Sequence, residues 1–115
     1  MVWVWRVAFA VSVAATCYLT LMPIENPPPM PAGSDKVIHF AIFATDALLA
    51  LAAFRGRSRR LSLLGLLVLG VLLEVLQGQV PGRMPSVADA LANWAGVLGA
   101  GLSRRIATRR PAARQ

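Results

Sequence analysis

Long apolar runs, each interrupted by a few polar positions, dominate this chain. A membrane-spanning helix needs about 20 mostly apolar residues, with a range of about 17 to 25. Four segments reach or approach that length, at residues 2–22, 37–54, 61–80 and 87–102. The last is short and rich in Ala and Gly, and local thinning of the bilayer accommodates such a span. The pattern therefore predicts an all-α fold, a small polytopic membrane bundle of four transmembrane helices.

The connections between these segments differ in composition. Residues 23–33 hold five prolines, and because proline lacks the amide donor that a helix needs, we expect an extended loop there. Residues 55–60 indicate a short basic turn, and residues 80–86 a tight Pro/Gly loop. The chain thus divides into a four-helix domain over residues 1–103 and a basic, frayed tail over residues 104–115.

Arginine placement predicts the orientation of the segments. Four Arg residues lie between the second and third segments, and five lie in the tail. Lys and Arg are retained on the cytoplasmic side of a membrane, and with four spans these two regions fall on the same side. We therefore expect a multi-pass protein of the bacterial inner membrane with both termini in the cytoplasm and residues 23–33 and 80–86 facing outward.

Composition and charge agree with a membrane protein. Hydrophobic residues make up 57% of the chain and charged residues 15%, against about 25% charged residues in a soluble domain. The net charge of +7 comes from short Arg runs between apolar stretches, a pattern typical of membrane topology rather than of a nucleic-acid partner. The single cysteine, Cys17, lies in an apolar run and indicates a membrane-buried side chain rather than a disulfide or a lipoprotein signal.

Polar side chains interrupt the last three apolar segments. Each ionisable group in a span costs about 2.5–3.5 kcal/mol at the bilayer centre, so such groups usually face the bundle interior or a wet cavity. The side chains concerned are Asp35, Lys36, His39, Asp46, Glu74, Gln77, Asp89 and Asn93. Spacings of three, four and seven residues put those of each helix on one face. We expect the three polar faces to pack inward.

Depth along the helices predicts where these faces meet. His39, Gln77 and Asp89 lie near the outer ends of their segments, Glu74 lies about one turn deeper, and Asp46 is deeper and separate. We expect a ligand-binding cluster at the outer end, with Arg83 above it, made of Asp35, His39, Glu74, Gln77, Arg83, Asp89 and Asn93. No metal-ligand spacing stands out, so we expect no metal and no cofactor.

Structural roles compete with this hypothesis. Asp89 follows Ser86 at the spacing of a helix capping box and fits a capping role. Asn93 suits a hydrogen bond between helices. Glu74 is a buried carboxylate that needs a partner, for which Arg83 and His39 are the candidates. A structural ion pair explains Glu74 as well as a ligand site does.

Three short motifs between residues 34 and 89 resemble those of the VanZ-like membrane proteins. They are SDKVIHF at residues 34–40, LEVLQ at residues 73–77 and GRMPSVAD at residues 82–89. The resemblance spans roughly residues 34–101, and the family's motif positions correspond here to Asp35, Lys36, His39, Glu74, Gln77, Arg83, Pro85, Asp89, Asn93 and Gly96. It implies a bacterial cell-envelope protein, since the founding member is associated with low-level resistance to the glycopeptide teicoplanin.

We expect the polar cluster to bind a membrane lipid headgroup or a lipid-linked peptidoglycan precursor, and so to modulate glycopeptide susceptibility. Arg83, His39 and Lys36 would contact phosphate. An intramembrane enzyme in which His39 acts with a carboxylate as acid and base is one alternative, although no nucleophile with an adjacent base is evident. A purely structural membrane subunit is another. The sequence does not determine the oligomeric state. A small transporter is a further alternative, and four short helices would have to oligomerise to form one.

Overall fold

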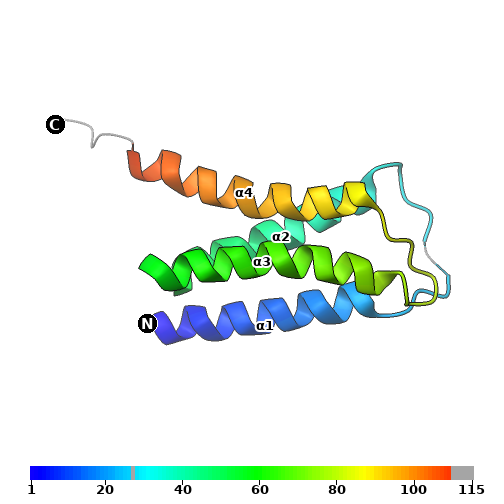
Figure 1. Ribbon diagram of the computed structural model, residues 1–115, viewed down its shortest axis with the longest axis horizontal. Helices are drawn as coiled ribbons and strands as arrows, with labels where there is room; N and C mark the ends of the chain where they lie inside the picture. Colours follow the sequence, from blue (N-terminus) through cyan, green and yellow to red (C-terminus); the bar gives the residue numbers. More distant parts are fainter. Residues whose placement is uncertain (27, 110–115) are drawn as a thin grey trace.

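The apolar segments form an up-and-down bundle. The computed structural model describes residues 1–26 and 28–109, which contain four helices and no strand. The helices, shown in Figure 1, are α1 (Val2–Leu21), α2 (Ser34–Ala53), α3 (Gly56–Gln77) and α4 (Val87–Arg109). The all-helical bundle expected from the sequence is therefore confirmed.

Three of the helices have the length and hydropathy of membrane spans. α1, α2 and α3 are each long and apolar enough to cross a membrane. At a rise of 1.5 Å per residue, 20 residues reach about 30 Å, which matches a hydrocarbon core of about 30 Å. α4 is the longest helix, with 23 residues, but three arginines make its last turns polar. The chain is a membrane protein, and a fourth span by α4 stays a prediction.

The helices begin and end at positions that differ from those expected. α2 begins at Ser34, three residues before the expected start at residue 37. It follows Gly33, which lies in the left-handed region at a φ of 86°. α3 begins at Gly56, so the expected basic turn is wrong, because the arginines after Gly56 form the first turn of that helix. Arginine is a good helix former, so a run of arginines does not by itself indicate a turn. α3 ends at Gln77, a few residues before the expected boundary.

Two expectations concern regions that the structure describes only in part. The tail expected to fray is helical through Arg109, and residues 110–115 lie outside the described residues. Helix continues there because the basic residues follow Ala- and Leu-rich turns without a breaker. The described residues of the proline-rich connection contain no helix, as expected, and Pro27 lies outside the described residues.

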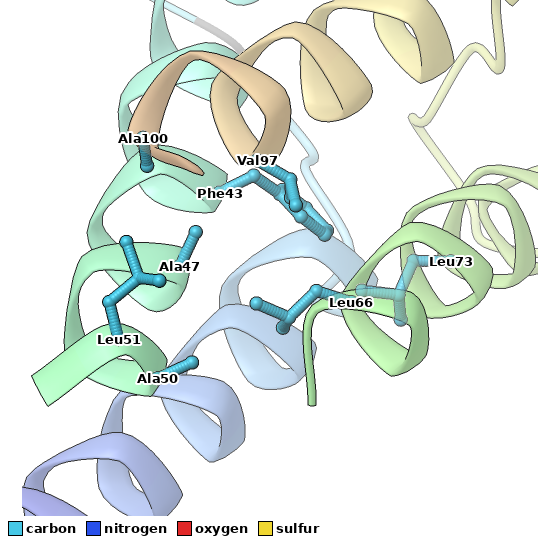
Figure 2. Packing of buried hydrophobic residues seen from close by; sticks show 8 residues of the cluster. All are labelled: Phe43, Ala47, Ala50, Leu51, Leu66, Leu73, Val97 and Ala100. Atoms are coloured by element: carbon cyan, nitrogen blue, oxygen red, sulfur yellow. The ribbon is translucent and has the colours of Figure 1, made fainter. Parts of the chain in front are cut away.

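Small residues on α2 and α4 produce the tightest contact in the bundle. α2 packs more extensively against α4 than against any other helix. A Cβ atom on Gly96 would lie 2.4 Å from the carbonyl oxygen of Phe40 and 2.9 Å from the amide nitrogen of Ala44, so only glycine fits between these backbones. Small residues drive helix association in lipid in this way. The apolar cluster beside this contact, shown in Figure 2, consists of Phe43, Ala47, Ala50, Leu51, Leu66, Leu73, Val97 and Ala100.

Large apolar side chains cover the outside of the bundle. They include Trp3, Val11, Leu64, Val68 and Leu98, all exposed, whereas Asp46 and Asn93 are almost completely buried. Soluble monomers rarely expose such extended apolar surface. The inverted distribution fits helices whose outer faces contact lipid tails and whose polar groups are satisfied internally.

The two ends of the bundle differ in chemistry. The connections at residues 22–33 and 78–86 lie together at one end, which we call the loop end (Figure 1). There Ile24 donates a backbone hydrogen bond of 3.3 Å to Pro81, and Gly82, at φ 78°, lies so close to Ile24 that no Cβ fits. The opposite end, here called the arginine end, carries Arg55, Arg57, Arg59, Arg60, Arg104, Arg105 and Arg109.

Candidate functional site

Three ionisable side chains from three different helices meet at the loop end. His39 of α2, Glu74 of α3 and Asp89 of α4 each offer a ring nitrogen or carboxylate oxygen, and these atoms all lie within 4.8 Å of one another. The His39 Nε2 atom lies 3.8 Å from Oδ2 of Asp89. Both carboxylates are buried and the histidine is half-buried. We call this group the His–Glu–Asp cluster.

Asn93 orients the imidazole of the cluster. Its amide nitrogen donates a hydrogen bond of 3.3 Å to the carbonyl oxygen of Gly70, so its oxygen faces His39, at 2.9 Å from Nδ1. An amide oxygen only accepts, and Nδ1 is therefore the donor. In the neutral imidazole the proton is then on Nδ1, and the lone pair of Nε2 faces Asp89.

The carboxylate of Asp89 does not cap its helix. The side-chain oxygen of Ser86 accepts a bond of 3.0 Å from the amide of Asp89, which is the first half of a capping box. In the second half, the carboxylate of Asp89 would accept from the amide of Ser86. Glu74 takes that amide instead, with a bond of 2.7 Å to its Oε1 atom. The expected capping role is therefore wrong for the side chain of Asp89, because α3 supplies the acceptor.

Within residues 1–26 and 28–109, two buried carboxylate oxygens of the cluster have no hydrogen-bond partner. They are Oε2 of Glu74 and Oδ1 of Asp89. The ammonium of Lys36 lies 3.4 Å from that Asp89 oxygen as an ion pair, and 3.3 Å from Asp35. Lys36 and Asp35 are largely exposed, so their pair lies at the rim of the site. An unpartnered buried polar group costs about 1–3 kcal/mol and more when it is charged, which makes this cluster a costly arrangement.

Arg83 and Gln77 bind α1 rather than the cluster. Nε of Arg83 donates a bond of 2.9 Å to the carbonyl oxygen of Met22, and Nη2 donates to that of Leu19. Nε2 of Gln77 donates a bond of 2.8 Å to the carbonyl oxygen of Thr20. These carbonyls belong to the end of α1, where a helix lacks internal partners and favours a cation. The expected pairing of Arg83 with Glu74 is therefore wrong.

The guanidinium of Arg83 is nonetheless part of the site's electrostatics. Partial burial lowers the pKa of Arg83, but the ordinary pKa of an arginine lies far above neutrality. It therefore stays protonated at neutral pH and contributes a positive charge at the loop end.

A pocket of about 210 Å³ lies above the cluster. Its lining residues are Ile24, Asp35, His39, Gln77, Gly82, Arg83, Met84 and Asp89. Five of the seven residues expected for a ligand site therefore share one cavity. The other two, Glu74 and Asn93, contact the cluster from the buried interior of the bundle.

A second polar site joins α1 to α2, away from this pocket. Asp46 is fully buried and accepts hydrogen bonds from the hydroxyls of Ser12 and Thr16, the latter at 2.7 Å. It was expected to lie deeper and separately, but its hydroxyl partners were missed. Their spacing of four residues on α1, continued by Thr20, was the available signal.

A second cavity, larger than the loop-end pocket, lies at the arginine end and was also missed. It has a volume of about 770 Å³ and lies between α3 and α4, among aliphatic side chains such as Leu64 and Leu98. Two of its arginines donate to the carbonyl oxygen of Leu51, Arg59 at 3.3 Å and Arg104 at 3.4 Å, and so satisfy the end of α2. Arg59 and Arg104 thus have structural partners, unlike the orphaned carboxylate oxygens of the loop end.

Comparisons with protein families, with curated proteins and with solved structures find no match to this chain.

Proposed function

We propose that this chain is a VanZ-like protein of the bacterial inner membrane whose loop-end pocket binds the phosphate-bearing headgroup of a lipid or of a lipid-linked peptidoglycan precursor. One observation carries the proposal. A pocket lined by charged side chains lies where helices of about 30 Å end. For helices that span a bilayer, this position would correspond to the depth of the headgroups. Exposed apolar helix faces around it would accept the acyl chains.

Cationic and donor groups at the pocket suit a phosphate. The ammonium of Lys36 is half-exposed and held only by acidic side chains at more than 3 Å. His39 and Arg83 line the pocket, and the positive end of the α4 dipole lies beside Asp89 in the first turn of that helix. Charge-assisted hydrogen bonds from such groups are the usual means of holding phosphate.

The orientation follows from the charge of the other end. Arginines at the start of α3 and the end of α4 gather at the arginine end, and positive residues stay in the cytoplasm. With four spans, both termini are then cytoplasmic, and the pocket faces the outer leaflet, where it would meet cell-wall precursors. Binding of such a precursor would account for altered glycopeptide susceptibility.

Native mass spectrometry of the full chain in detergent tests the binding. Wild type is compared with Lys36→Gln, and Arg60→Gln at the arginine end is the matched control. Loss of one charge-assisted contact, about 1.5–3 kcal/mol, is expected to weaken binding of a phosphate-bearing lipid about tenfold or more. Diacylglycerol, which has no phosphate, should bind all three proteins equally.

The control separates the two ends of the molecule. Lipid lost from Arg60→Gln and retained by Lys36→Gln would move lipid binding to the cavity of the arginine end and contradict the proposal. Equal retention by both variants would favour a purely structural role for the loop-end side chains. In cells, overproduced wild type but not Lys36→Gln should change the susceptibility to teicoplanin.

An intramembrane enzyme that acts on a headgroup is a second candidate, favoured by one observation. His39 lines the pocket beside Asp89, and in the neutral imidazole its Nε2 atom carries the lone pair that a general base needs. Incubation of the purified protein with radiolabelled phospholipid should then yield a product that His39→Gln does not form. Binding without turnover would reject this candidate and leave the first unaffected.

A further inference from the structure

The His–Glu–Asp cluster has a composition and spacing that a lipid headgroup alone does not explain. Its three ligand-type atoms come from α2, α3 and α4 and lie within 4.8 Å of one another. Cations such as Zn²⁺ hold nitrogen and oxygen ligands at about 2.0–2.2 Å, so ligand atoms around one ion lie roughly 3–4 Å apart. The 3.8 Å between His39 and Asp89 falls in that range, and a ligand atom of Glu74 lies within 4.8 Å of both.

A buried anionic oxygen of the cluster lacks a partner. Glu74 is only 6% exposed, and its Oε2 atom accepts no hydrogen bond, although Oε1 accepts one from Ser86. Buried polar atoms are satisfied almost without exception, and an orphan in a native structure calls for an explanation such as an ion. A cation bound at Oε2 would provide that partner.

The histidine is held in the state that binds a metal. Since Nδ1 donates to Asn93, the bare Nε2 lone pair faces the carboxylate of Asp89. Two such electron-rich groups repel each other unless a proton or a cation lies between them. Metal-bound histidines commonly donate their second ring N–H to a carbonyl or carboxylate, which is the role of the Asn93 amide here.

The charge balance of the cluster favours a dication. Asp89 pairs with the ammonium of Lys36 and faces the imidazole of His39. Glu74 has no ion pair within residues 1–26 and 28–109, and Asp35 adds a further negative charge at the rim. Arg83 is occupied by the carbonyl oxygens of α1. Lys36 is half-exposed and can turn outward, so it is a competitor that a stronger cation displaces.

We propose that His39, Glu74 and Asp89 bind a divalent transition-metal cation of the Zn²⁺ or Mn²⁺ type. One imidazole with two carboxylates suits these ions, whereas Mg²⁺ and Ca²⁺ prefer ligand sets made only of oxygen. Because His39 and Asp89 line the pocket, the coordination position left open faces it. A phosphate oxygen could occupy that position, but the cation site itself does not rest on headgroup binding.

Titration of the metal-stripped full chain with Zn²⁺ and, separately, Mn²⁺ tests the proposal in detergent free of phosphate-bearing lipid. Isothermal calorimetry is expected to show one saturable site per chain. His39→Gln and Asp89→Asn should each weaken binding about tenfold or more, since loss even of a residue that only orients a ligand typically costs about 10–100-fold. Glu25→Gln, which removes an exposed carboxylate of the loop end that does not line the pocket, is the matched control and should bind as wild type does.

Lys36→Gln distinguishes this proposal from headgroup binding. Removal of the competing ammonium should tighten cation binding, whereas it should weaken the binding of a phosphate-bearing lipid to the metal-free protein. The experiment can therefore reject the cation site without rejecting headgroup binding, and the reverse.

X-ray absorption at the zinc edge of the wild-type protein keeps the test independent of how the variants fold. It should show one imidazole nitrogen and otherwise oxygen ligands. Absence of saturable binding, affinity unchanged in His39→Gln, or a zinc spectrum without imidazole would overturn the proposal.

Discussion

Single polar side chains complete the ends of the helices in this bundle. Arg83 satisfies the last carbonyls of α1, Arg59 and Arg104 satisfy those of α2, and Glu74 takes the amide of Ser86 at the start of α4. Backbone groups at helix ends lack internal partners, and unsatisfied ones are costly in or near lipid. Arginines that the sequence marks as topology signals thus also hold the helices together.

Arg83→Gln tests this role at the residue scale. The variant keeps much of the side-chain length but loses the charge and the fork that binds two carbonyls of α1. We expect the free energy of unfolding in micelles to fall by about 1.5–3 kcal/mol, the range for a hydrogen bond from a charged group. Arg57→Gln, on an exposed position of α3, is the control and should change little. Equal losses in both variants would argue against capping by Arg83.

The buried Asp46 supports a second prediction at this scale. Thr16 donates its hydroxyl to this carboxylate at 2.7 Å, so Thr16→Val should destabilise the protein only while the carboxylate is present. The double-mutant cycle of Thr16→Val with Asp46→Leu should give a coupling of about 0.6–1.7 kcal/mol, as for side-chain bonds between other membrane helices. Additive effects in chemical unfolding would show that the hydroxyl contributes no net stability.

At the scale of the helices, the contact between α2 and α4 positions the site. Gly96 brings the two backbones together. On α2, His39 directly precedes Phe40, whose carbonyl oxygen lies at this contact, and on α4, Asp89 lies about two turns before Gly96. The third ligand-type residue, Glu74, belongs to α3. Asn93 of α4 links this helix to α4 by donating a hydrogen bond to the carbonyl oxygen of Gly70. The geometry of the cluster is therefore a consequence of helix packing rather than of any local motif.

Gly96→Ala should separate α2 from α4. Its Cβ would lie 2.4 Å from a backbone oxygen, and overpacking of this kind typically costs about 1–3 kcal/mol. Gly101→Ala on the same helix is a matched control, because nothing lies within 4 Å of the added atom. It gains helix propensity of roughly 0.5–1 kcal/mol without a clash. Thermal unfolding should move in opposite directions for the two variants, and a stabilised Gly96→Ala would contradict the packing described here.

At the scale of the whole molecule, the distribution of charge separates two ends along a particle 57 Å long. The loop end holds the pocket and the cluster, and the arginine end holds positive side chains around an apolar cavity. If α4 spans together with the three more apolar helices, the two ends lie on opposite sides of the membrane. The pocket is then accessible from one side only.

Cysteine labelling in intact cells tests that arrangement. In a Cys17→Ser background, Met30→Cys reports on the loop end and Ser58→Cys on the arginine end, and both native side chains are exposed. A membrane-impermeant maleimide should label position 30 in intact cells and position 58 only after lysis, because the arginine-rich end stays in the cytoplasm. The reverse pattern, or labelling of both positions from outside, would exclude four spans with cytoplasmic termini.

Much of the fold and part of the candidate site follow from local features of the chain. In lipid each segment must satisfy its own backbone, so apolar runs of sufficient length determine the helices. Helical spacing and depth also assign His39, Glu74 and Asp89 to the inner faces near one end, because periodicity relates a residue's position to its face. Boundaries were less accurate at Gly56 and after Leu102, where arginines continue the helices without a breaker.

The partner of each polar side chain was decided by tertiary structure. Glu74 binds the amide of Ser86 rather than Arg83, because Gly82 passes close to Ile24 and carries the loop toward α1. Periodicity places a side chain on a face and at a depth, but it contains neither the path of a loop nor the rotation of one helix against another. Those follow from packing, and packing alone brings a bare histidine nitrogen and two buried carboxylates to one point.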